Sequence, residues 1–176
     1  MSLDVNPVGK CYALWLVPAE PAFSLLAGQI ARLSRELSTP QFDPHVTLLS
    51  GITLPEDETL ARSAALAARL TSFQIEPAGI NCLDEYFRCV FVDVIPDVPI
   101  LKARQAASEI FGMQDEPTYM PHISLVYGKL RLETRVKIVA ELGSMTVRRF
   151  EVRQLAIWRV SGPVREWVCI KEFDLK

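Results

Sequence analysis

Two histidines carry the chemistry of this chain, because its 176 residues contain no others besides His45 and His122. Each lies in the same local pattern of proline, histidine, apolar residue and hydroxyl: PHVT at 44–47 and PHIS at 121–124. One such motif alone is more often structural than catalytic. Since proline makes up about 5% of residues, its presence before both histidines would arise by chance about once in 400 cases. We therefore interpret the two motifs as parts of one shared site.

The spacing within each motif predicts which side chains act together. Residues two apart on a β-strand point to the same face, so Thr47 should lie beside His45, and Ser124 beside His122. An imidazole titrates near pH 6.5 and can accept or donate a proton at neutral pH. Two imidazoles flanking a phosphorus atom could serve as general base and general acid, with the hydroxyls donating to phosphate oxygens. Such chemistry needs no metal.

The elements that position the two motifs recur in the same order in both halves of the chain. Four pairs of segments match at a spacing of 77 or 78 residues: 11–18 with 89–96, 44–49 with 121–126, Gly51 with Gly128, and 73–76 with 150–153. We predict a single domain over 1–176, built from two pseudo-symmetric halves at about 10–83 and 87–174. A cleft between these halves would hold one histidine from each.

Hydrophobic spacing predicts the secondary structure. Apolar residues three or four apart predict helices over 20–37, 55–70, 98–111 and 132–142. Short β-rich runs predict strands over 12–17, 44–49, 73–76, 87–95, 121–126, 150–153 and 166–173. We therefore predict an α+β fold, in which largely antiparallel sheets from two duplicated lobes surround the cleft and the helices pack outside.

Composition narrows the partners. The 19 basic and 21 acidic residues give a net charge of −2, which argues against a long polyanion held on a basic face but allows a small phosphate site. The first residues, MSLDVNP, lack the features of a secretory signal, and the apolar runs are too short to span a membrane. We expect a cytoplasmic monomer with no membrane segment.

The four cysteines do not suggest a metal site. Cys11, Cys82, Cys89 and Cys169 include no CxxC pair, and two isolated histidines do not complete a zinc set. We expect reduced and mostly buried thiols, although the sequence leaves a disulfide open. We also expect no metal and no cofactor.

The paired motifs in a duplicated chain resemble the 2H phosphoesterase superfamily, and within it the plant- and yeast-type cyclic phosphodiesterases. The resemblance covers nearly the whole chain and is carried by four segments: 12–18 (YALWLVP), 42–48 (FDPHVTL), 86–91 (YFRCVF) and 119–128 (YMPHISLVYG). The bacterial RNA-ligase-like branch usually follows its first motif with an Arg-Phe-Leu-Gly-like run. This chain has LSG at 49–51 instead, which argues against that branch.

The resemblance implies a metal-independent hydrolase that opens a 2′,3′-cyclic nucleotide, or ADP-ribose 1″,2″-cyclic phosphate, to a phosphomonoester. For nucleotides the implied product is the 2′-phosphate. His122 would activate the water and His45 would protonate the departing 3′-oxygen. Thr47 and Ser124 would bind the phosphate. Small cyclic phosphates are the expected partners, and the sequence leaves RNA ends as a second candidate.

Three further side chains are weaker candidates. Trp15 matches a family position at the substrate site and could stack on a base, or it could simply belong to the core. Tyr127 also matches such a position, but it would point away from the site unless the strand ends or twists near Gly128. Asp93 lies 78 residues after Trp15 and could meet ribose hydroxyls or face solvent.

Other functions compete with hydrolysis of a cyclic nucleotide. The same cleft could belong to a module that binds a nucleotide or RNA end without turnover. An RNA 2′,3′-cyclic phosphodiesterase of the bacterial ligase-like branch is a second alternative. A serine or cysteine hydrolase is disfavoured, because the sequence has no GxSxG motif and no cysteine near a histidine.

Overall fold

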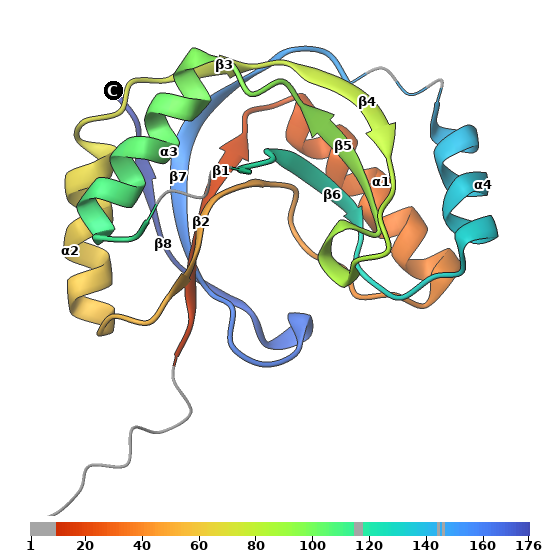
Figure 1. The fold of residues 1–176 in the computed structure, drawn as a ribbon, viewed down its shortest axis with the longest axis horizontal. Coiled ribbons are helices and arrows are strands. Elements are labelled where there is room, and N and C mark those ends of the chain that lie inside the picture. Colours follow the sequence, from red (N-terminus) through yellow and green to blue (C-terminus); the bar gives the residue numbers. More distant parts are fainter. Residues whose placement is uncertain (1–9, 115–117, 144, 146) are drawn as a thin grey trace, which may run out of the picture.

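A computed structural model describes residues 10–114, 118–143, 145 and 147–176, and within them eight strands form one sheet (Figure 1). The strands are β1 (Tyr12–Pro18), β2 (Val46–Ile52), β3 (Phe73–Ile75), β4 (Pro77–Asn81), β5 (Val90–Val94), β6 (His122–Val126), β7 (Phe150–Arg159) and β8 (Val168–Asp174). The helices are α1 (Ala22–Leu37), α2 (Glu56–Ala67), α3 (Val98–Phe111) and α4 (Leu132–Leu142). Two 3₁₀ turns, η1 (Tyr86–Arg88) and η2 (Val164–Glu166), precede β5 and β8.

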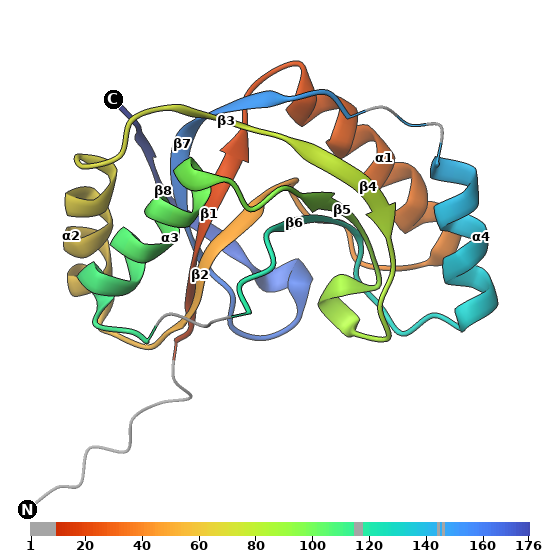
Figure 2. The same cartoon turned by 45° about the horizontal axis from the view of Figure 1, so that its top comes forward.

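The sheet bends into a nearly closed ring. Its strand order is β3-β7-β1-β2-β6-β5-β4, with β8 added beside β7, and every pair is antiparallel. Because one residue separates β3 from β4, the two ends of this order are continuous along the chain (Figure 2). The predicted α+β class with antiparallel strands is confirmed, although one sheet replaces two because β2 pairs with β6. β1 and β5, which the predicted repeat relates to each other, lie on either side of that pair, while the division into halves stays a prediction.

The helices flank the sheet as two pairs that mix early and late parts of the chain. α1 and α4 lie on one side of the molecule and α2 and α3 on the other (Figures 1 and 2). Arg32 of α1 forms an ion pair with Glu141 of α4 at 2.9 Å. Arg62 of α2 donates to the carbonyl oxygen of Ile110 in α3 at 2.7 Å. None of the described helices is long and apolar enough to cross a membrane.

Some strands differ from their predicted bounds for local reasons. The strands predicted over 87–95 and 166–173 begin at Val90 and Val168, since a 3₁₀ turn occupies the start of each segment. β7 extends to Arg159 because it pairs with both β1 and β8. β4 was not predicted, since its sequence PAGIN contains proline and glycine and lacks apolar alternation.

Alternation along β2 separates core from cleft. Val46 and Leu48 are fully buried on the core side, as predicted, while Thr47 lies on the other face. A register shift follows, because Leu14 pairs with Leu49 whereas Trp15 pairs with Thr47. This bulge buries two successive leucines and then returns the next residues to the cleft face.

The core under the site gives the first prediction. Leu48 is fully buried, and its carbonyl oxygen accepts a 2.7 Å hydrogen bond from Arg104. We expect Leu48→Ala to lower the free energy of unfolding by about 2–5 kcal/mol, because it leaves a cavity in a packed core. Val136→Ala, on the exposed face of α4, should change it by less than about 0.5 kcal/mol. Urea unfolding curves measure both, and equal losses would contradict the assigned core.

Candidate active site

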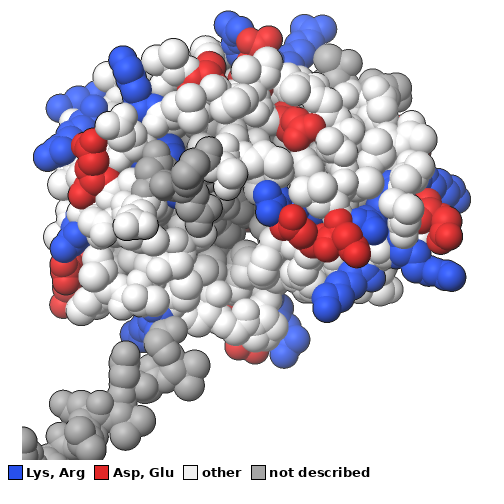
Figure 3. Space-filling model, in the orientation of Figure 1, with Lys and Arg blue, Asp and Glu red and all other residues white. Residues whose placement is uncertain are grey.

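A cleft of about 490 Å³ opens on the face of the sheet opposite the core. Residues of β1, β2, β6, the η1 turn and the β7–β8 hairpin line it. In Figure 3 a hollow lies near the middle of this face, with mostly uncharged walls and charged side chains at one edge. Of the six predicted site residues, the lining includes five: Trp15, His45, Thr47, His122 and Tyr127. Ser124 is the sixth and is not among the lining residues.

The register of β2 against β6 brings the two histidine motifs together. Val46 pairs with Ile123, and each of these residues follows its histidine directly. In an antiparallel ladder this register sets His45 across from Ser124 and Thr47 across from His122, all on the face opposite the buried pair. The two histidines are then diagonal neighbours on one face of the sheet.

Each imidazole has its tautomer fixed by the backbone. Nδ1 of His45 lies 2.6 Å from the carbonyl oxygen of Asp43, and Nδ1 of His122 lies 2.9 Å from that of Met120. A carbonyl oxygen can only accept, so the hydrogen of each neutral ring sits on Nδ1. Nε2 therefore keeps its lone pair and is the nitrogen left for chemistry in the cleft.

Burial keeps both imidazoles neutral at pH 7. It lowers the pKa of His45 from 6.5 to about 3, against the raising effect of the Asp43 carbonyl and with a small further lowering from His122. Burial also lowers the pKa of His122, and the nearby Arg88 guanidinium lowers it further. The Met120 carbonyl and the carboxylates of Asp93 and Glu85 act in the opposite direction on His122.

The two hydroxyls differ in availability. Among the described residues, the Thr47 hydroxyl has no hydrogen-bond partner, so it can donate into the cleft. Ser124 is 4% exposed, and its hydroxyl donates to the carbonyl oxygen of Phe87 at 2.7 Å. A contact between Ser124 and phosphate, as expected from the sequence, would require that bond to be exchanged. The role of Ser124 at the phosphate therefore stays a prediction.

Trp15 stacks on His45, and neither face of its ring is open for stacking on a nucleobase. Its ring centroid is 3.4 Å from that of His45, with the planes within 1° of parallel, and 4.3 Å from that of Trp158. Two rings this close to one centroid must occupy opposite faces, so both faces of the indole are covered. Trp15 lines the cleft while being 2% exposed. The sequence allowed either packing in the core or stacking on a base. The covered ring faces agree with packing.

Tyr127 enters the cleft because β6 ends at Val126. Its ring stacks on Phe42 with centroids 3.7 Å apart, and its hydroxyl lies 3.4 Å from Nε2 of His45. Burial raises the pKa of Tyr127, so the phenol stays protonated. The strand thus ends near Gly128, which is what Tyr127 needs in order to point into the cleft.

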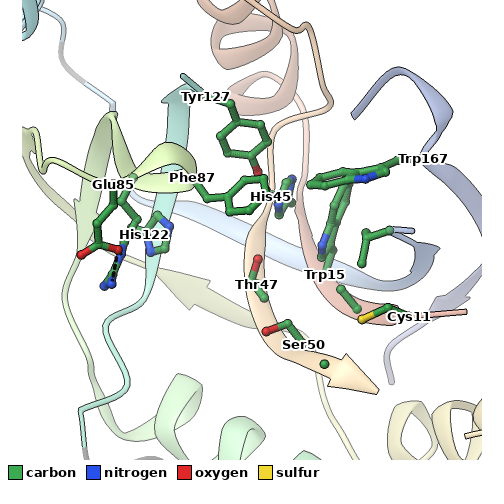
Figure 4. Close-up of a pocket in the computed structure, with 14 residues that line it drawn as sticks. Cys11, Trp15, His45, Thr47, Ser50, Glu85, Phe87, His122, Tyr127 and Trp167 are labelled. Atoms are coloured by element: carbon green, nitrogen blue, oxygen red, sulfur yellow. Dashed lines mark hydrogen bonds and ion pairs between the residues drawn. The ribbon is translucent and has the colours of Figure 1, made fainter. Parts of the chain in front are cut away.

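Sequence reasoning missed nine of the fourteen described residues that line the cleft, and four of the nine carry charged or aromatic side chains. Glu85, Phe87 and Arg88 come from the η1 turn and its start, and Trp167 follows η2 on the β7–β8 hairpin (Figure 4). A carboxylate and a guanidinium three residues apart just before a strand could have signalled the first group. The hairpin that brings Trp167 to the cleft had no such signal, because it depends on the β7–β8 pairing.

The remaining candidates lie at the margin of the cleft. Asp93 pairs with His122 across β5 and β6, and its carboxylate accepts a 3.5 Å hydrogen bond from Asn81, but it is not among the lining residues.

All four cysteines are free; Cys89 is buried and the others are half-buried, with Cys11 lining the cleft. Within the described residues, no group of three or more histidine, cysteine or carboxylate side chains could hold a metal ion.

Comparisons with known proteins agree on one family and fold. The profile of the family described as "Cyclic phosphodiesterase-like protein" matches residues 11–175. A relative named "Cyclic phosphodiesterase" from Arabidopsis thaliana is 27% identical over 127 residues, which cover 70% of this chain and 68% of the relative.

Solved structures share the fold at low identity. E. coli LigT complexed with 3′-AMP superposes with a TM-score of 0.59 at 12% identity, covering 97% of this chain and 99% of LigT. The protein TT0787 of Thermus thermophilus superposes with a TM-score of 0.62 at 16% identity, covering 94% of this chain and 97% of TT0787. The nearly closed antiparallel sheet with flanking helices is therefore an architecture shared with these proteins.

The imidazole environments give the second prediction. At pH 7, long-range ¹H–¹⁵N spectra should show both histidines as neutral rings protonated on Nδ1. On acidification His45 should remain neutral through pH 5, since burial lowers its pKa to about 3. His45→Gln assigns the remaining signal to His122. A His45 ring that titrates near 6.5 would contradict its burial.

The free energy of unfolding should depend on pH because of the same two lowered pKa values. The unfolded chain titrates its histidines near 6.5, whereas the folded pKa values of both rings lie lower. Below pH 6.5 the unfolded state therefore binds more protons, and the free energy of unfolding falls as the pH is lowered. His45→Gln should flatten this dependence between pH 6.5 and 4, measured by urea unfolding.

Proposed function

The chain belongs to the family of cyclic phosphodiesterase-like proteins, within the 2H phosphoesterase superfamily, and from that membership we propose which phosphodiester it opens and how. It is an enzyme that hydrolyses phosphodiesters. We propose that its substrate is a nucleoside 2′,3′-cyclic phosphate, with ADP-ribose 1″,2″-cyclic phosphate as a related candidate. We propose further that His45 and His122 are its acid–base pair.

One observation carries this proposal: two neutral imidazoles in the same tautomer line one cleft. Both rings donate Nδ1–H to the carbonyl two residues earlier, so both Nε2 atoms keep a lone pair for proton transfer, and that of His45 lies 3.4 Å from the Tyr127 hydroxyl. A pair of this kind is suited to a reaction in which one proton is taken and another is given. A module that only binds nucleotides would have no need for two histidines held in this way.

The proposed reaction is an in-line displacement at phosphorus. His122 Nε2 takes a proton from the attacking water as the new P–O bond forms. The bond from phosphorus to the 3′-oxygen breaks, and His45, which takes a proton from solvent onto Nε2 when the phosphate anion binds, gives that proton to the oxygen. The product carries a 2′-phosphate and a 3′-hydroxyl, and solvent restores the two imidazoles.

The surroundings of each ring support these roles in different ways. Arg88 lowers the pKa of His122 and so favours its neutral form, which a base needs. His45 must gain its proton while buried, so we propose that it does so together with the phosphate anion, whose charge compensates that of the imidazolium. The free Thr47 hydroxyl would donate to a non-bridging oxygen, whose negative charge grows in the transition state.

Loss of either imidazole gives the third prediction. His45→Ala and His122→Ala should each lower kcat for 2′,3′-cyclic AMP by about 10²–10⁴-fold, because each removes one proton transfer. ³¹P NMR of the wild-type reaction should show the 2′-phosphate, and EDTA should leave the rate unchanged. The matched control is Glu172→Ala on the exposed face of β8, outside the cleft.

Full turnover by either histidine variant would contradict the paired mechanism. Tight binding of a cyclic nucleotide by calorimetry, with no product over hours, would favour the binding module instead. A panel of cyclic mononucleotides, RNA with a 2′,3′-cyclic end and ADP-ribose cyclic phosphate tests the choice of substrate.

The division of roles gives the fourth prediction. A substrate with sulfur in place of the bridging 3′-oxygen releases a thiolate, which leaves without a proton. His45→Ala should therefore lose far less activity on the sulfur substrate than on the oxygen substrate, while His122→Ala should lose similar activity on both. The opposite pattern in the two variants would reverse the assignment of acid and base.

A further inference from the structure

The cleft contains a single fully charged cation for an anionic substrate. Of the described residues that line it, Arg88 is the one lysine or arginine, and both imidazoles are neutral in the free protein. A phosphodiester carries one negative charge, and attack by water adds a second in the transition state. The Ser124 proton is donated to a carbonyl oxygen, and among the described lining residues the hydroxyls of Thr47 and Ser50 have no hydrogen-bond partner. Both are neutral donors, so Arg88 is the one charged donor that the described lining offers to this growing charge.

Arg88 is held rigidly at the edge of the cleft. Its turn is fixed by two hydrogen bonds from β6 and the residues after it: Ser124 Oγ donates to the Phe87 carbonyl at 2.7 Å, and Gly128 N donates to the Tyr86 carbonyl at 2.9 Å. Glu85 Oε2 then accepts from Arg88 Nε at 2.8 Å and lies 2.5 Å from Nη2. A guanidinium held in this way loses little side-chain entropy when it binds an anion.

One nitrogen of this guanidinium still has hydrogens to donate. Nη1 contacts the sulfur of Met120 at 4.0 Å, and a thioether is a weak acceptor. Among the described residues, no oxygen accepts from Nη1. The salt bridge to Glu85 therefore uses one edge of the guanidinium and leaves Nη1 for a ligand.

The same methionine connects Arg88 to the catalytic pair. The Met120 carbonyl accepts from Nδ1 of His122, while its sulfur touches Arg88. Figure 4 shows the Glu85 side chain beside His122, with the ion pair to Arg88 drawn as a dashed line. Arg88 and Glu85 both act electrostatically on His122, in opposite directions. The guanidinium therefore lies on the same side of the cleft as His122 and acts on it electrostatically.

We propose that Arg88 binds a non-bridging oxygen of the phosphate through Nη1 and that Glu85 holds the guanidinium in position for it. Ser124 is then a positioning residue, because its hydroxyl fixes the turn that carries Arg88. This inference rests on the proposed cyclic phosphodiesterase function of the cleft. It assigns to one arginine the charge stabilisation that two hydroxyls were expected to share.

Binding of inorganic phosphate tests the proposal without requiring turnover. Isothermal titration calorimetry at low ionic strength should show weaker binding to Arg88→Gln than to wild type by about 10-fold or more. Arg88→Lys keeps the charge but loses the two-nitrogen contact with Glu85, so it should fall between them. Arg153→Gln removes an exposed arginine from an ion pair with Glu151 outside the cleft, and it should bind phosphate as wild type does.

Kinetics separate a phosphate contact from a merely structural salt bridge. With 2′,3′-cyclic AMP, Arg88→Gln should lower kcat/KM by about 10- to 100-fold. Arg88 lowers the pKa of His122, so its loss should raise that pKa. Because the base must be neutral, the acidic limb of the pH profile of Arg88→Gln should move to higher pH. Glu85→Gln should move that limb to lower pH and cause a smaller loss. The midpoint of thermal unfolding shows that each variant folds.

The outcomes distinguish the two levels of the proposal. If Arg88→Gln binds phosphate and turns over substrate within about twofold of wild type, the role of Arg88 is overturned. If wild type binds phosphate through Arg88 but opens no cyclic phosphate, the proposed function fails while the anion site stands. If wild type binds no phosphate at millimolar concentrations, the Arg88 site is overturned regardless of turnover.

Discussion

The pairing of β2 with β6 is the constraint on which the rest of the site depends. It joins two motifs that lie 77 residues apart, and its register sets the residue after one histidine against the residue after the other. Val46 and Ile123 are both fully buried, so the core fixes this register through the faces that do not carry the chemistry. A slip of either strand by one residue would turn the imidazole of that strand into the core. The stability of the fold and the geometry of the cleft are thus consequences of the same contact.

Within that frame the two halves of the cleft differ in polarity. His45 is enclosed by aromatic rings, with Trp15 on its face, Phe42 at its edge and the Tyr127 hydroxyl near Nε2. His122 instead lies near charged groups, including Arg88 and Glu85. An apolar enclosure excludes water and strengthens any charge that forms within it, while the polar side can hold a charged group in place. Equivalent motifs are thus placed in unequal surroundings, which supports the proposed division into a base and an acid.

The sequence predicted the parts of this site that depend on local periodicity. Alternation along residues 44–48 correctly separated Val46 and Leu48 from the cleft face. Contacts between distant segments were beyond that reasoning. The hydroxyl of Ser124 is engaged by a carbonyl 37 residues earlier in the chain, and Trp15 is covered by Trp158 from a strand that was predicted too short. Both depend on which strands become neighbours, which no motif in the sequence specifies.

The charge of the cleft follows from how Arg88 is held, since no other arginine or lysine of the described part of the chain lines it. Glu85 neutralises Arg88 in the free protein, so the lining carries no net fixed charge while its histidines are neutral. A long polyanion gains little from such a surface, since its affinity depends on many unpaired cations. A compact anion in the proposed site would gain more, because it meets oriented donors that are already held in place. The overall charge of −2 is consistent with this selection by geometry, in which a few fixed groups replace a basic surface.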